Sequence, residues 1–593
     1  MRKAALVSAL VVCACLGVRA ERSAAPPEPE AEATPPPAQE PTPPAPAEAP
    51  EPLPPPLPPP EPTPLPVPEP PPPAADLADP LDLLWGHRLE FASGGEPLVT
   101  IGLMDGQREI AFRPRAAAQV LLRGGGKVEV PAGVRLAVRT RDTAPARLAW
   151  SAVAADEPIA GHDAAVALRA GLEADGIAAR IKVSGAVYGI AGRVVDNRRE
   201  QVVVEGDGGE AAARAAIEAL RARGLRAVLD QDLVARPSGV LVLLGPGGAP
   251  LGEADGALTL LVEGDAGVVV ESVEHGRGPG RAREDRSYKG RLYVALDPGG
   301  LLAAIHGVPL EELLRGIVPS EMPGGSPIEA LKAQAVTARS NVLAQIGVRH
   351  LNDPFMLCAE VHCQAYRGDG ARTPRTDEAV RATRGEALFG LEDRRLVDGV
   401  YSAMCGGYGE DNDAVWGKAP SASLRGHPDV PPEEASRWAG GLAQDGTLRA
   451  FLSSPSGAYC RLPGARRDRF RWERRLEPQR LHEIGDALGV GRVRSLRVLS
   501  RGSSGRARVL RVEGERGAVE IGPELQIRRA LGDLPSAMFV VDRDGESLVL
   551  RGGGWGHGVG LCQWGAVGRA MSGQGYQEIL RAYFSGAEVG KIY

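Results

Sequence analysis

A long proline-rich segment near the N-terminus limits where this chain can fold. Residues 24–75 are almost all Pro, Glu and Ala. A segment of this composition cannot bury an apolar core, and it favours extended polyproline conformations. At about 3.1 Å per residue it could span roughly 150 Å, which predicts a spacer over residues 21–80. The globular part of the 593-residue chain is therefore expected from about residue 81 onward.

The first twenty residues are typical of an export signal. Met-Arg-Lys is followed by a mostly apolar run from Ala4 to Gly17 and by the small-residue pattern Val18-Arg-Ala20. The run is too short for a membrane span, so residues 1–20 are predicted to be a signal peptide. Val12-Cys-Ala-Cys15 loosely matches a lipoprotein box in which Cys15 would carry the lipid. Simple cleavage is favoured over lipidation, and either outcome predicts an extracytoplasmic protein in the periplasm or cell envelope.

Length and charge restrict the remaining classes. A globular part of this length suggests two or more domains. The formal net charge of -6 gives no electrostatic support for a nucleic-acid partner.

Residues 81–285 are expected to be rich in strands. Within them, residues 148–230 show a strand, a helix at 162–175, strands at 179–183, 192–195 and 201–204, a helix at 210–223, and a strand at 226–229. This β-α-β-β-α-β order predicts a ferredoxin-like unit. The order and the two helix endings also resemble the SPOR module, which binds glycan strands stripped of their peptides. A plain structural α+β domain is the favoured interpretation.

Glu321 is the first candidate for chemistry. It lies in the apolar, proline-containing stretch 316–325, which is predicted to be a loop. Apolar surroundings raise a carboxyl pKa, and a raised pKa suits a group that donates a proton and then takes one back. Ser326-Pro-Ile-Glu329 reads as a capping box that starts a helix running to about residue 346. A nearby helix N-terminus would instead favour the carboxylate.

Several sequence blocks in the C-terminal half carry a family resemblance. Among them are Leu310-Glu-Glu-Leu-Leu-Arg-Gly-Ile-Val-Pro-Ser-Glu-Met-Pro323, Glu329-Ala-Leu-Lys-Ala-Gln-Ala-Val-Thr-Ala-Arg-Ser340, Tyr401-Ser-Ala-Met-Cys-Gly-Gly407 and Gly554-Trp-Gly-His-Gly-Val-Gly-Leu-Cys-Gln-Trp-Gly-Ala566. Residues 286–593 thereby resemble the SpoIID/LytB family of peptidoglycan-acting proteins. The fold class expected for the whole chain is α+β, with a mixed-sheet catalytic domain at 286–593 preceded by the strand-rich region 81–285.

The resemblance implies a lytic transglycosylase that acts on glycan strands without stem peptides. Glu321 matches the family's catalytic acid. It would protonate the glycosidic oxygen and then take a proton from the sugar's own C6 hydroxyl, which closes an anhydro ring. Ordinary glycosidases use two carboxylates, and the sequence shows no evident partner for Glu321.

Six further residues are candidates for glycan binding. Gln334 and Arg339 lie on the predicted helix, about 140° apart around its axis. A structural ion pair is an equally good interpretation of Arg339. Tyr401 and Ser402 follow a strand-like run, and His557 and Gln563 belong to the glycine-rich block. For these four residues, structural packing is the competing interpretation.

The cysteines form two sets. His350, Cys358, His362 and Cys363 offer two imidazoles and two thiolates, which suit tetrahedral zinc. The resemblance implies a structural zinc here, and the chemistry itself requires no cofactor; a Cys358–Cys363 disulfide is the alternative. The family blocks also imply a Cys405–Cys460 disulfide, which leaves Cys562 buried beside Trp564.

Two other function classes stay open. One is a non-catalytic protein that binds peptidoglycan glycan strands or enhances cell-wall amidases. The other is a Cys/His peptidase that uses Cys363 or Cys562 with His557, and the clustering of the cysteines argues against it.

Overall fold

The computed structural model describes residues 79–593, apart from 206–208, 276–281, 361, 418, 455–456 and 463–466. The predicted signal peptide, nearly all of the predicted linker and Cys15 lie outside the described residues. Among the helices that are described, none has the length and apolar character needed to cross a membrane.

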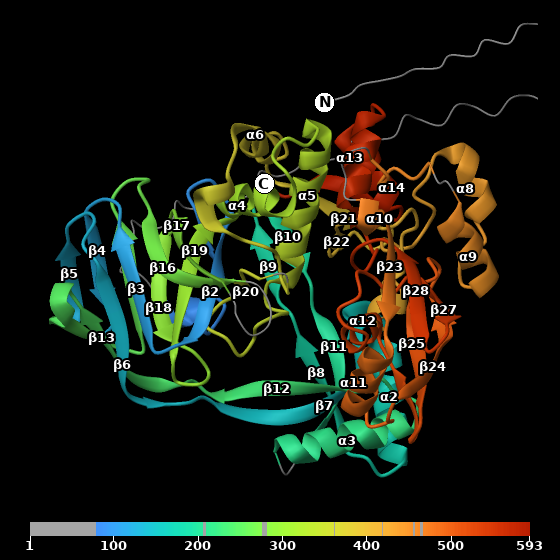
Figure 1. Cartoon of the computed structure of the whole chain (residues 1–593). Coiled ribbons are helices and arrows are strands. Elements are labelled where there is room, and N and C mark those ends of the chain that lie inside the picture. Colours follow the sequence, from blue (N-terminus) through green and yellow to red (C-terminus); the bar gives the residue numbers. More distant parts are fainter. Residues whose placement is uncertain are drawn as a thin grey trace, which may run out of the picture. The chain divides into compact units, whose positions relative to one another are not determined.

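Two antiparallel sheets form the N-terminal part of the described chain (Figure 1). The first has the order β1 (Glu90–Phe91), β2 (Pro97–Gln107), β19 (Leu302–Pro309), β18 (Arg291–Leu296), β15 (Ala257–Val262), β4 (Ala118–Leu122), β5 (Gly126–Val130), with β20 (Leu357–Cys358) added in parallel on β2. The second has the order β14 (Pro250–Asp255), β13 (Ser238–Leu244), β6 (Leu136–Ala144), β3 (Glu109–Pro114), β16 (Val268–His275), β17 (Ala282–Tyr288).

Alternating apolar residues bury both faces of the first sheet. Along β19, Leu302 and Ala304 belong to the large core, which also contains Phe112 and Val138 of the second sheet. Their neighbours Ala303 and Ile305 face a smaller core on the other side. There the short helix α1 (Pro80–Leu84) supplies Leu83 and Leu84.

The domain boundary expected at residue 285 does not separate two folded units in the structure. It falls inside β17, and the first sheet contains strands from both sides of it. Residues 97–130 and 257–309 therefore share one core.

The predicted ferredoxin-like order is confirmed for residues 147–235. The unit runs β7 (Arg147–Pro158), α2 (His162–Ala174), β8 (Ala179–Ser184), β11 (Arg199–Glu205), α3 (Glu210–Ala222), β12 (Val228–Ala235). Its antiparallel sheet has the order β12-β7-β11-β8, and the apolar faces of both helices pack on it. Because β6 and β13 pair with each other, the whole unit is inserted between two neighbouring strands of the second sheet.

A hairpin inserted in this unit reaches the C-terminal half. The segment 192–195, predicted to extend the ferredoxin-like sheet, instead forms β10 (Arg193–Asp196), which pairs with β9 (Val187–Ile190). The Asn197 amide donates to the carbonyls of Ala344 and Ile346, at 3.1 and 2.7 Å, and Tyr188 donates to that of Leu343. These carbonyls end the long helix α5, so the hairpin caps it.

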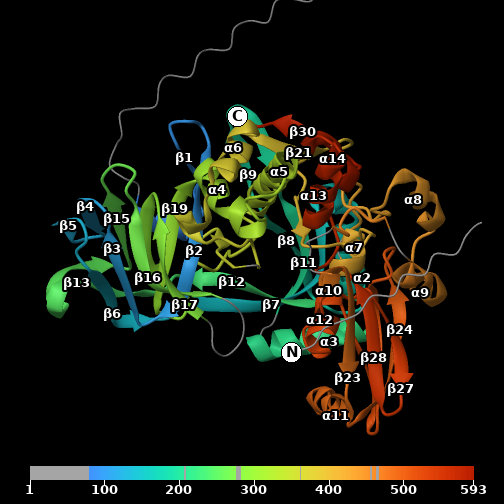
Figure 2. The ribbon, with the colours of Figure 1, turned by 45° about the horizontal axis from the view of Figure 1, so that its top comes forward.

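Helices make up the layer that carries the candidate site. α5 (Ile328–Gln345) is buried along most of its length and contacts α4 (Leu310–Glu321), α6 (Pro374–Ala382), α13 (Gln563–Met571) and α14 (Tyr576–Tyr583). Figure 2 shows these helices grouped together. Two short strand pairs adjoin them: antiparallel β21 (Glu386–Gly390) with β30 (Ala587–Lys591), and parallel β22 (Tyr401–Ser402) with β29 (Leu561–Cys562).

The predicted capping box is absent. Helix α5 begins after Pro327, and no side chain caps it. Glu329 instead accepts a hydrogen bond from the Tyr576 backbone at 2.9 Å and bonds Lys332 at 2.7 Å. The local motif therefore gives way to a contact with α14.

A second small core lies inside the C-terminal half and was not expected. Two three-stranded sheets and two helices build it: β23 (Arg471–Leu476), β28 (Ser547–Gly553), β27 (Phe539–Asp544); β24 (Val493–Arg501), β25 (Ala507–Gly514), β26 (Gly517–Ile521); α11 (Pro478–Ala487) and α12 (Glu524–Ala530). The short helices α7 (Asn412–Trp416), α8 (Pro432–Trp438), α9 (Asp445–Ser453) and α10 (Arg467–Phe470) precede or flank it. The fold class is α+β, as predicted.

Candidate functional site

Glu321 is the last residue of helix α4. The loop that was predicted from the prolines of residues 316–325 is therefore wrong at this position. Pro319 lies inside α4, where it removes the backbone hydrogen bond to the carbonyl of Arg315 in the last turn. The free carbonyls of a helix C-terminus carry partial negative charge, which disfavours a carboxylate. The electrostatic effect of α4 therefore has the opposite sign to the effect expected from a following helix N-terminus.

Two hydrogen-bond donors hold the Glu321 carboxyl group. The Ala365 backbone N–H donates to Oε1 at 2.8 Å, and the Gln563 amide donates to Oε2 at 3.2 Å. The nearby Tyr401 hydroxyl also lowers the carboxyl pKa, while it donates its proton to Gln364. Burial raises the pKa of Glu321 above its usual range, and these polar neighbours only partly oppose that effect. Within the described part of the chain, the groups that contact the two oxygens include no carboxylate.

A glutamine pair extends this site into the core. Gln334 of α5 is fully buried, and its Oε1 lies 3.4 Å from the Gln563 amide nitrogen. The Nε2 of Gln334 is buried and makes no hydrogen bond among the described residues. A buried donor of this kind is costly unless a ligand or water satisfies it.

Tyr401 joins Glu321 to a second segment. Its hydroxyl lies 3.1 Å from Gln364 Oε1, one residue before Ala365. Gln364 is held in turn by the Ala338 carbonyl and Asn341 of α5, at 3.2 and 2.9 Å. The structure therefore brings the candidates Glu321, Gln334, Tyr401 and Gln563 together, and it adds Gln364 and Ala365, which the sequence did not indicate.

Ser402 and His557 hold the glycine-rich segment in place. His557 Nε2 lies 2.9 Å from the Tyr401 carbonyl, and the Val559 N–H donates to Nδ1 at 3.0 Å. Both ring nitrogens are thus engaged within the protein, and burial lowers the pKa of His557 to about 4. Ser402 Oγ accepts from the Gly558 N–H at 3.2 Å. The competing interpretation, structural packing, therefore applies to both residues.

Arg339 is a structural residue and not a glycan ligand. It is fully buried, and its guanidinium makes a bidentate ion pair with Glu311 of α4, at 2.8 and 2.9 Å. A third bond reaches the Glu386 carbonyl at 2.9 Å. The sequence left two equal interpretations of Arg339, glycan binding and a structural ion pair. The structure favours the ion pair, because no face of Arg339 is open to a substrate.

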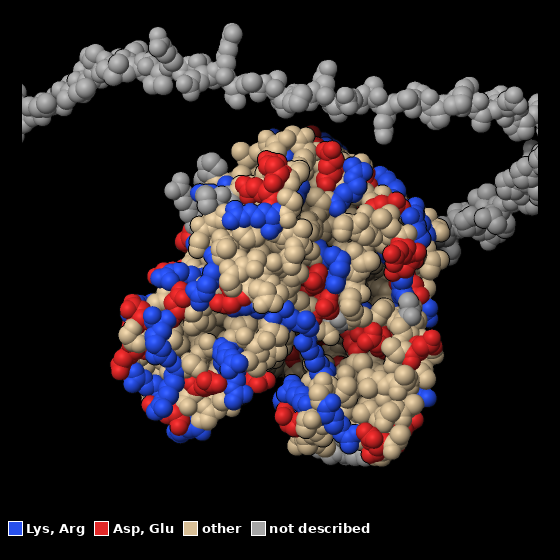
Figure 3. Space-filling view, turned by 90° about the vertical axis from the view of Figure 1, so that its right-hand side faces the viewer, with Lys and Arg blue, Asp and Glu red and all other residues tan. Residues whose placement is uncertain are grey.

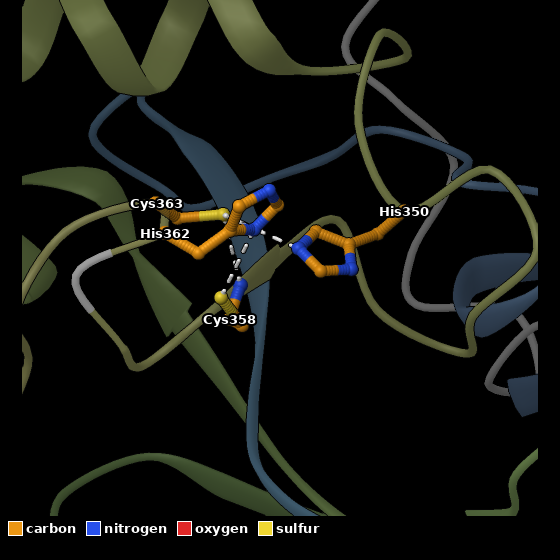
Figure 4. A group of neighbouring side chains, drawn as sticks. All are labelled: His350, Cys358, His362 and Cys363. Atoms are coloured by element: carbon orange, nitrogen blue, oxygen red, sulfur yellow. Dashed lines mark hydrogen bonds between the residues drawn. The ribbon is translucent and has the colours of Figure 1, made fainter. Parts of the chain in front are cut away.

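The four predicted metal ligands converge (Figure 4). His350 Nε2 lies 3.3 Å from Cys363 Sγ, and His362 Nδ1 lies 3.7 Å from both Cys358 Sγ and Cys363 Sγ. His350 Nδ1 bonds Asp353 at 2.8 Å, which leaves Nε2 directed at the cluster. Cys358 and Cys363 are free thiols in this structure. The cluster ends two residues before Ala365, which donates to Glu321.

Exposed tryptophans adjoin the glycine-rich segment and were not predicted as site residues. Trp416 and Trp555 are each 38% exposed. The Trp416 ring lies 5.1 Å from the His557 ring, and the Arg469 guanidinium lies 4.6 Å from the Trp555 ring. Large aromatic faces that stay open to solvent mark a binding surface. Trp555 lies in the family block 554–566, which was the signal that could have found it.

Charged side chains of both signs are mixed on the surface. Figure 3 shows basic and acidic side chains interleaved over the face that it draws.

The fold and the site define an α+β protein with one buried, hydrogen-bonded carboxyl group near a Cys/His cluster. The Stage II sporulation protein (SpoIID) family matches residues 299–389, which include Glu321, Gln334 and the cluster. Residues 410–560 match a domain of unknown function, DUF8618. The C-terminal half of the chain is thus similar to the SpoIID/LytB family, and the following relatives are similar to it as well.

Three curated relatives align over about half of the chain. An uncharacterized protein of Brachyspira hyodysenteriae is 25% identical over 49% of this chain and 68% of its own length. The amidase enhancer of Bacillus subtilis is 26% identical over 46% of this chain, but only 39% of its own length is covered. Stage II sporulation protein D of B. subtilis is 23% identical over 49% of this chain and 76% of its own length.

A solved structure of a protein described as exported, from Burkholderia pseudomallei, is 12% identical with a TM-score of 0.16. A score this low carries no argument about the fold.

Proposed function

We propose that this protein is a lytic transglycosylase that cleaves peptidoglycan glycan strands lacking stem peptides, with Glu321 as acid and then base. The family match and the relatives support the coarser statement, a role at the cell wall. The observation that carries the finer proposal is the Glu321 carboxyl group, whose pKa is raised by burial. A raised pKa favours the protonated form of the carboxyl group, which is the form that a general acid requires.

The reaction needs one carboxyl group because the nucleophile is part of the substrate. Glu321 gives its proton to the glycosidic oxygen, and the bond from that oxygen to C1 breaks. The C6 hydroxyl oxygen of the same sugar then bonds to C1, and the Glu321 carboxylate takes the hydroxyl proton. One C–O bond forms as one breaks, and no water is consumed. The absence of a carboxylate among the described contacts of Glu321 agrees with this scheme.

The neighbouring side chains orient the acid and the sugar. The Ala365 N–H and the Gln563 amide hold the two carboxyl oxygens, and the nearby Tyr401 hydroxyl lowers the carboxyl pKa. Gln334 is fully buried behind Gln563, so it supports the site from inside and is not open to the glycan. Trp416 and Trp555 offer apolar faces on which sugar rings can stack.

The Cys/His cluster fits a structural zinc. Zn–S bonds of about 2.3 Å and Zn–N bonds of about 2.0–2.1 Å at tetrahedral angles place neighbouring donors roughly 3.5–3.8 Å apart. The three nitrogen–sulfur separations in this cluster are 3.3–3.7 Å. His350, Cys358, His362 and Cys363 would hold the ion. Such an ion would stiffen the segment that leads to Ala365 and would not activate water.

The zinc proposal is tested by metal analysis of the purified chain. Cys363→Ser should release the ion, lower the melting temperature and weaken glycan cleavage without abolishing it. Cys405, Cys460 and Cys562 form a second group of thiols, so the measurement is repeated on a variant that also lacks them. Full zinc content in that variant would contradict the ligand assignment.

The central experiment is mass spectrometry of denuded glycan after incubation with the protein. Glu321→Gln should reduce the appearance of anhydro-ended fragments by a factor of about 10² to 10⁴, the usual contribution of a general acid. Glu378→Gln is the matched control, because Glu378 is an exposed carboxylate on α6. Unchanged release by the Glu321 variant would refute its role, and fragments with reducing ends would refute the ring closure.

A second candidate function is enhancement of a cell-wall amidase or wall binding without cleavage. It is favoured by the relative named an amidase enhancer and by the ferredoxin-like unit, whose order resembles a SPOR module. In that case the protein would sediment with denuded wall, raise the activity of an added amidase and generate no anhydro ends. Both candidates place the protein outside the cytoplasm, in contact with glycan strands. A lipid anchor at Cys15 stays the less favoured alternative to simple cleavage of the signal peptide.

A further inference from the structure

Four buried donor atoms meet at a second place in the C-terminal half. Cys405, Asp429, Cys460 and Cys562 are all buried, and their ligand atoms lie within 4.8 Å of one another. Cys405 follows β22, and Cys562 ends β29 and caps α13. Asp429 and Cys460 come from the segments before α8 and after α9. The set therefore joins four segments that are distant in sequence.

The separations match a shared metal ion better than a disulfide. Cys405 Sγ lies 3.7 Å from Cys460 Sγ and 3.2 Å from Asp429 Oδ2. Tetrahedral zinc with Zn–S bonds of about 2.3 Å places two sulfurs roughly 3.8 Å apart. A disulfide, as the family resemblance implied for Cys405 and Cys460, needs about 2.0 Å. All three cysteines are free thiols in this structure.

Backbone donors are directed at the sulfur atoms. The N–H groups of Cys405 and Gly565 both donate to Cys562 Sγ at 3.2 Å. The Gly407 N–H donates to Cys405 Sγ at 3.3 Å. Hydrogen bonds of this kind stabilise a thiolate, and the N-terminus of α13 favours negative charge on Cys562. Thiolate is the form that binds a metal ion.

The carboxylate is oriented by groups behind it. Asp429 Oδ1 accepts from the Arg569 guanidinium at 3.1 and 2.9 Å, and the Tyr583 hydroxyl contacts both carboxyl oxygens at 3.0–3.1 Å. Oδ2 is thereby directed at Cys405. Such outer partners are the usual support of metal ligands. Arg569 also offsets part of the negative charge that three thiolates and a carboxylate would leave around a divalent ion.

We propose that Cys405, Cys460, Cys562 and Asp429 bind one zinc ion in a closed structural site, separate from the His350 cluster. Binding one Zn²⁺ releases three thiol protons to solvent and changes no oxidation state. The site fastens β22 to β29 and so fixes Tyr401 and Gln563, which contact Glu321. The ion positions these residues and takes no part in bond cleavage. The proposal stands on the donor set alone and is independent of the proposed transglycosylase activity.

The test isolates the buried set. The double variant Cys358→Ser/Cys363→Ser removes the first cluster, and the full secreted chain carrying it should retain one zinc per molecule by elemental analysis. After exchange with cobalt, the same variant should show thiolate-to-cobalt charge-transfer absorption and tetrahedral d–d bands. Adding Cys460→Ser should lower the zinc content at least tenfold, and adding Asp429→Asn should keep the three-sulfur absorption while shifting the d–d bands.

A second measurement covers the case in which the Cys460 variant does not fold. The wild-type chain, denatured without reductant in the presence of a chelator, should react with three equivalents of alkylating reagent at Cys405, Cys460 and Cys562. A mass two hydrogens short, with Cys405 and Cys460 in one linked peptide, would overturn the proposal in favour of the disulfide. The proposal would also be overturned if the double variant Cys358→Ser/Cys363→Ser contained no zinc after expression in a zinc-containing medium.

Discussion

Replacing Arg339 by methionine should destabilise the protein and leave its affinity for glycan unchanged. The substitution removes both bonds of the ion pair with Glu311, at 2.8 and 2.9 Å, inside a fully buried site. Breaking a buried pair from one side costs about 3–5 kcal/mol, because the remaining charge is uncompensated. Glu311 keeps donors in the Gly385 N–H and the Tyr593 hydroxyl, so the expected loss lies near the lower end, about 3 kcal/mol.

Pulse proteolysis in urea measures this loss, since it reports the free energy of unfolding of the unit that contains α5. Arg384→Met is the matched control, because Arg384 is much more exposed and its pair with Glu96 should be worth at most about 1 kcal/mol. The double variant Arg339→Met/Glu311→Leu should recover most of the stability, as replacement of both partners by apolar groups is close to neutral.

The pH dependence has a definite sign. Burial alone would raise the pKa of Glu311, but Arg339, with Tyr593 and Gly385, holds it below its usual range. The wild-type carboxylate therefore stabilises the fold above its unfolded-state pKa, and this contribution is lost as the pH falls. In Arg339→Met burial is less opposed, the pKa rises, and the penalty is relieved at low pH. The stability gap between the two proteins should narrow from neutral pH toward about pH 4.

The result that refutes this reasoning is a variant of wild-type stability with a raised KM for denuded glycan. That outcome would make Arg339 a substrate ligand, which is the alternative interpretation of this residue from the sequence.

Three further predictions concern the site. Since burial raises the pKa of Glu321 and Gln563 partly opposes it, Gln563→Leu should move the high-pH limb of kcat/KM to still higher pH; a shift to lower pH in the pH–rate profile would contradict this. Gly558→Ala should cost about 1–2 kcal/mol or more in urea unfolding, because the residue has φ of +81° and its Cβ would lie 2.5 Å from Arg506 Cζ; wild-type stability would show that Arg506 moves freely. Trp416→Ala should weaken glycan retention in affinity electrophoresis by about 0.5–1.5 kcal/mol without changing the melting temperature, and unaltered retention would remove Trp416 from the binding surface.

Local pattern was enough to predict the ferredoxin-like unit. Its helices are amphipathic and end near glycines, and its strands are short and apolar, so each element is specified by nearby residues. The segment 192–195 was misassigned because a short strand does not reveal which strand it pairs with. Its partner is β9, the strand that precedes it in the same hairpin. Asn197, which follows the hairpin, then bonds the end of α5.

The site was predictable only where chemistry is carried by residue type. The four ligands of the first cluster lie within fourteen positions of each other, so their spacing was visible. Three features depended on contacts across the fold. Glu311 lies 28 residues from Arg339, Tyr576 lies 247 residues from Glu329, and Asp429 joins cysteines from three other segments. Proline misled the assignment of Glu321, since Pro319 was read as a loop signal and lies in the last turn of α4.

The cap that Asn197 places on α5 bears on how the protein can be divided. The carbonyls of Ala344 and Ile346 belong to the helix that carries Gln334, yet their donor comes from a unit inserted far upstream. A truncated chain beginning at the family match would lose this donor and also most strands of the sheet to which β19 belongs. The strands upstream of the family match are therefore part of the scaffold on which the site depends.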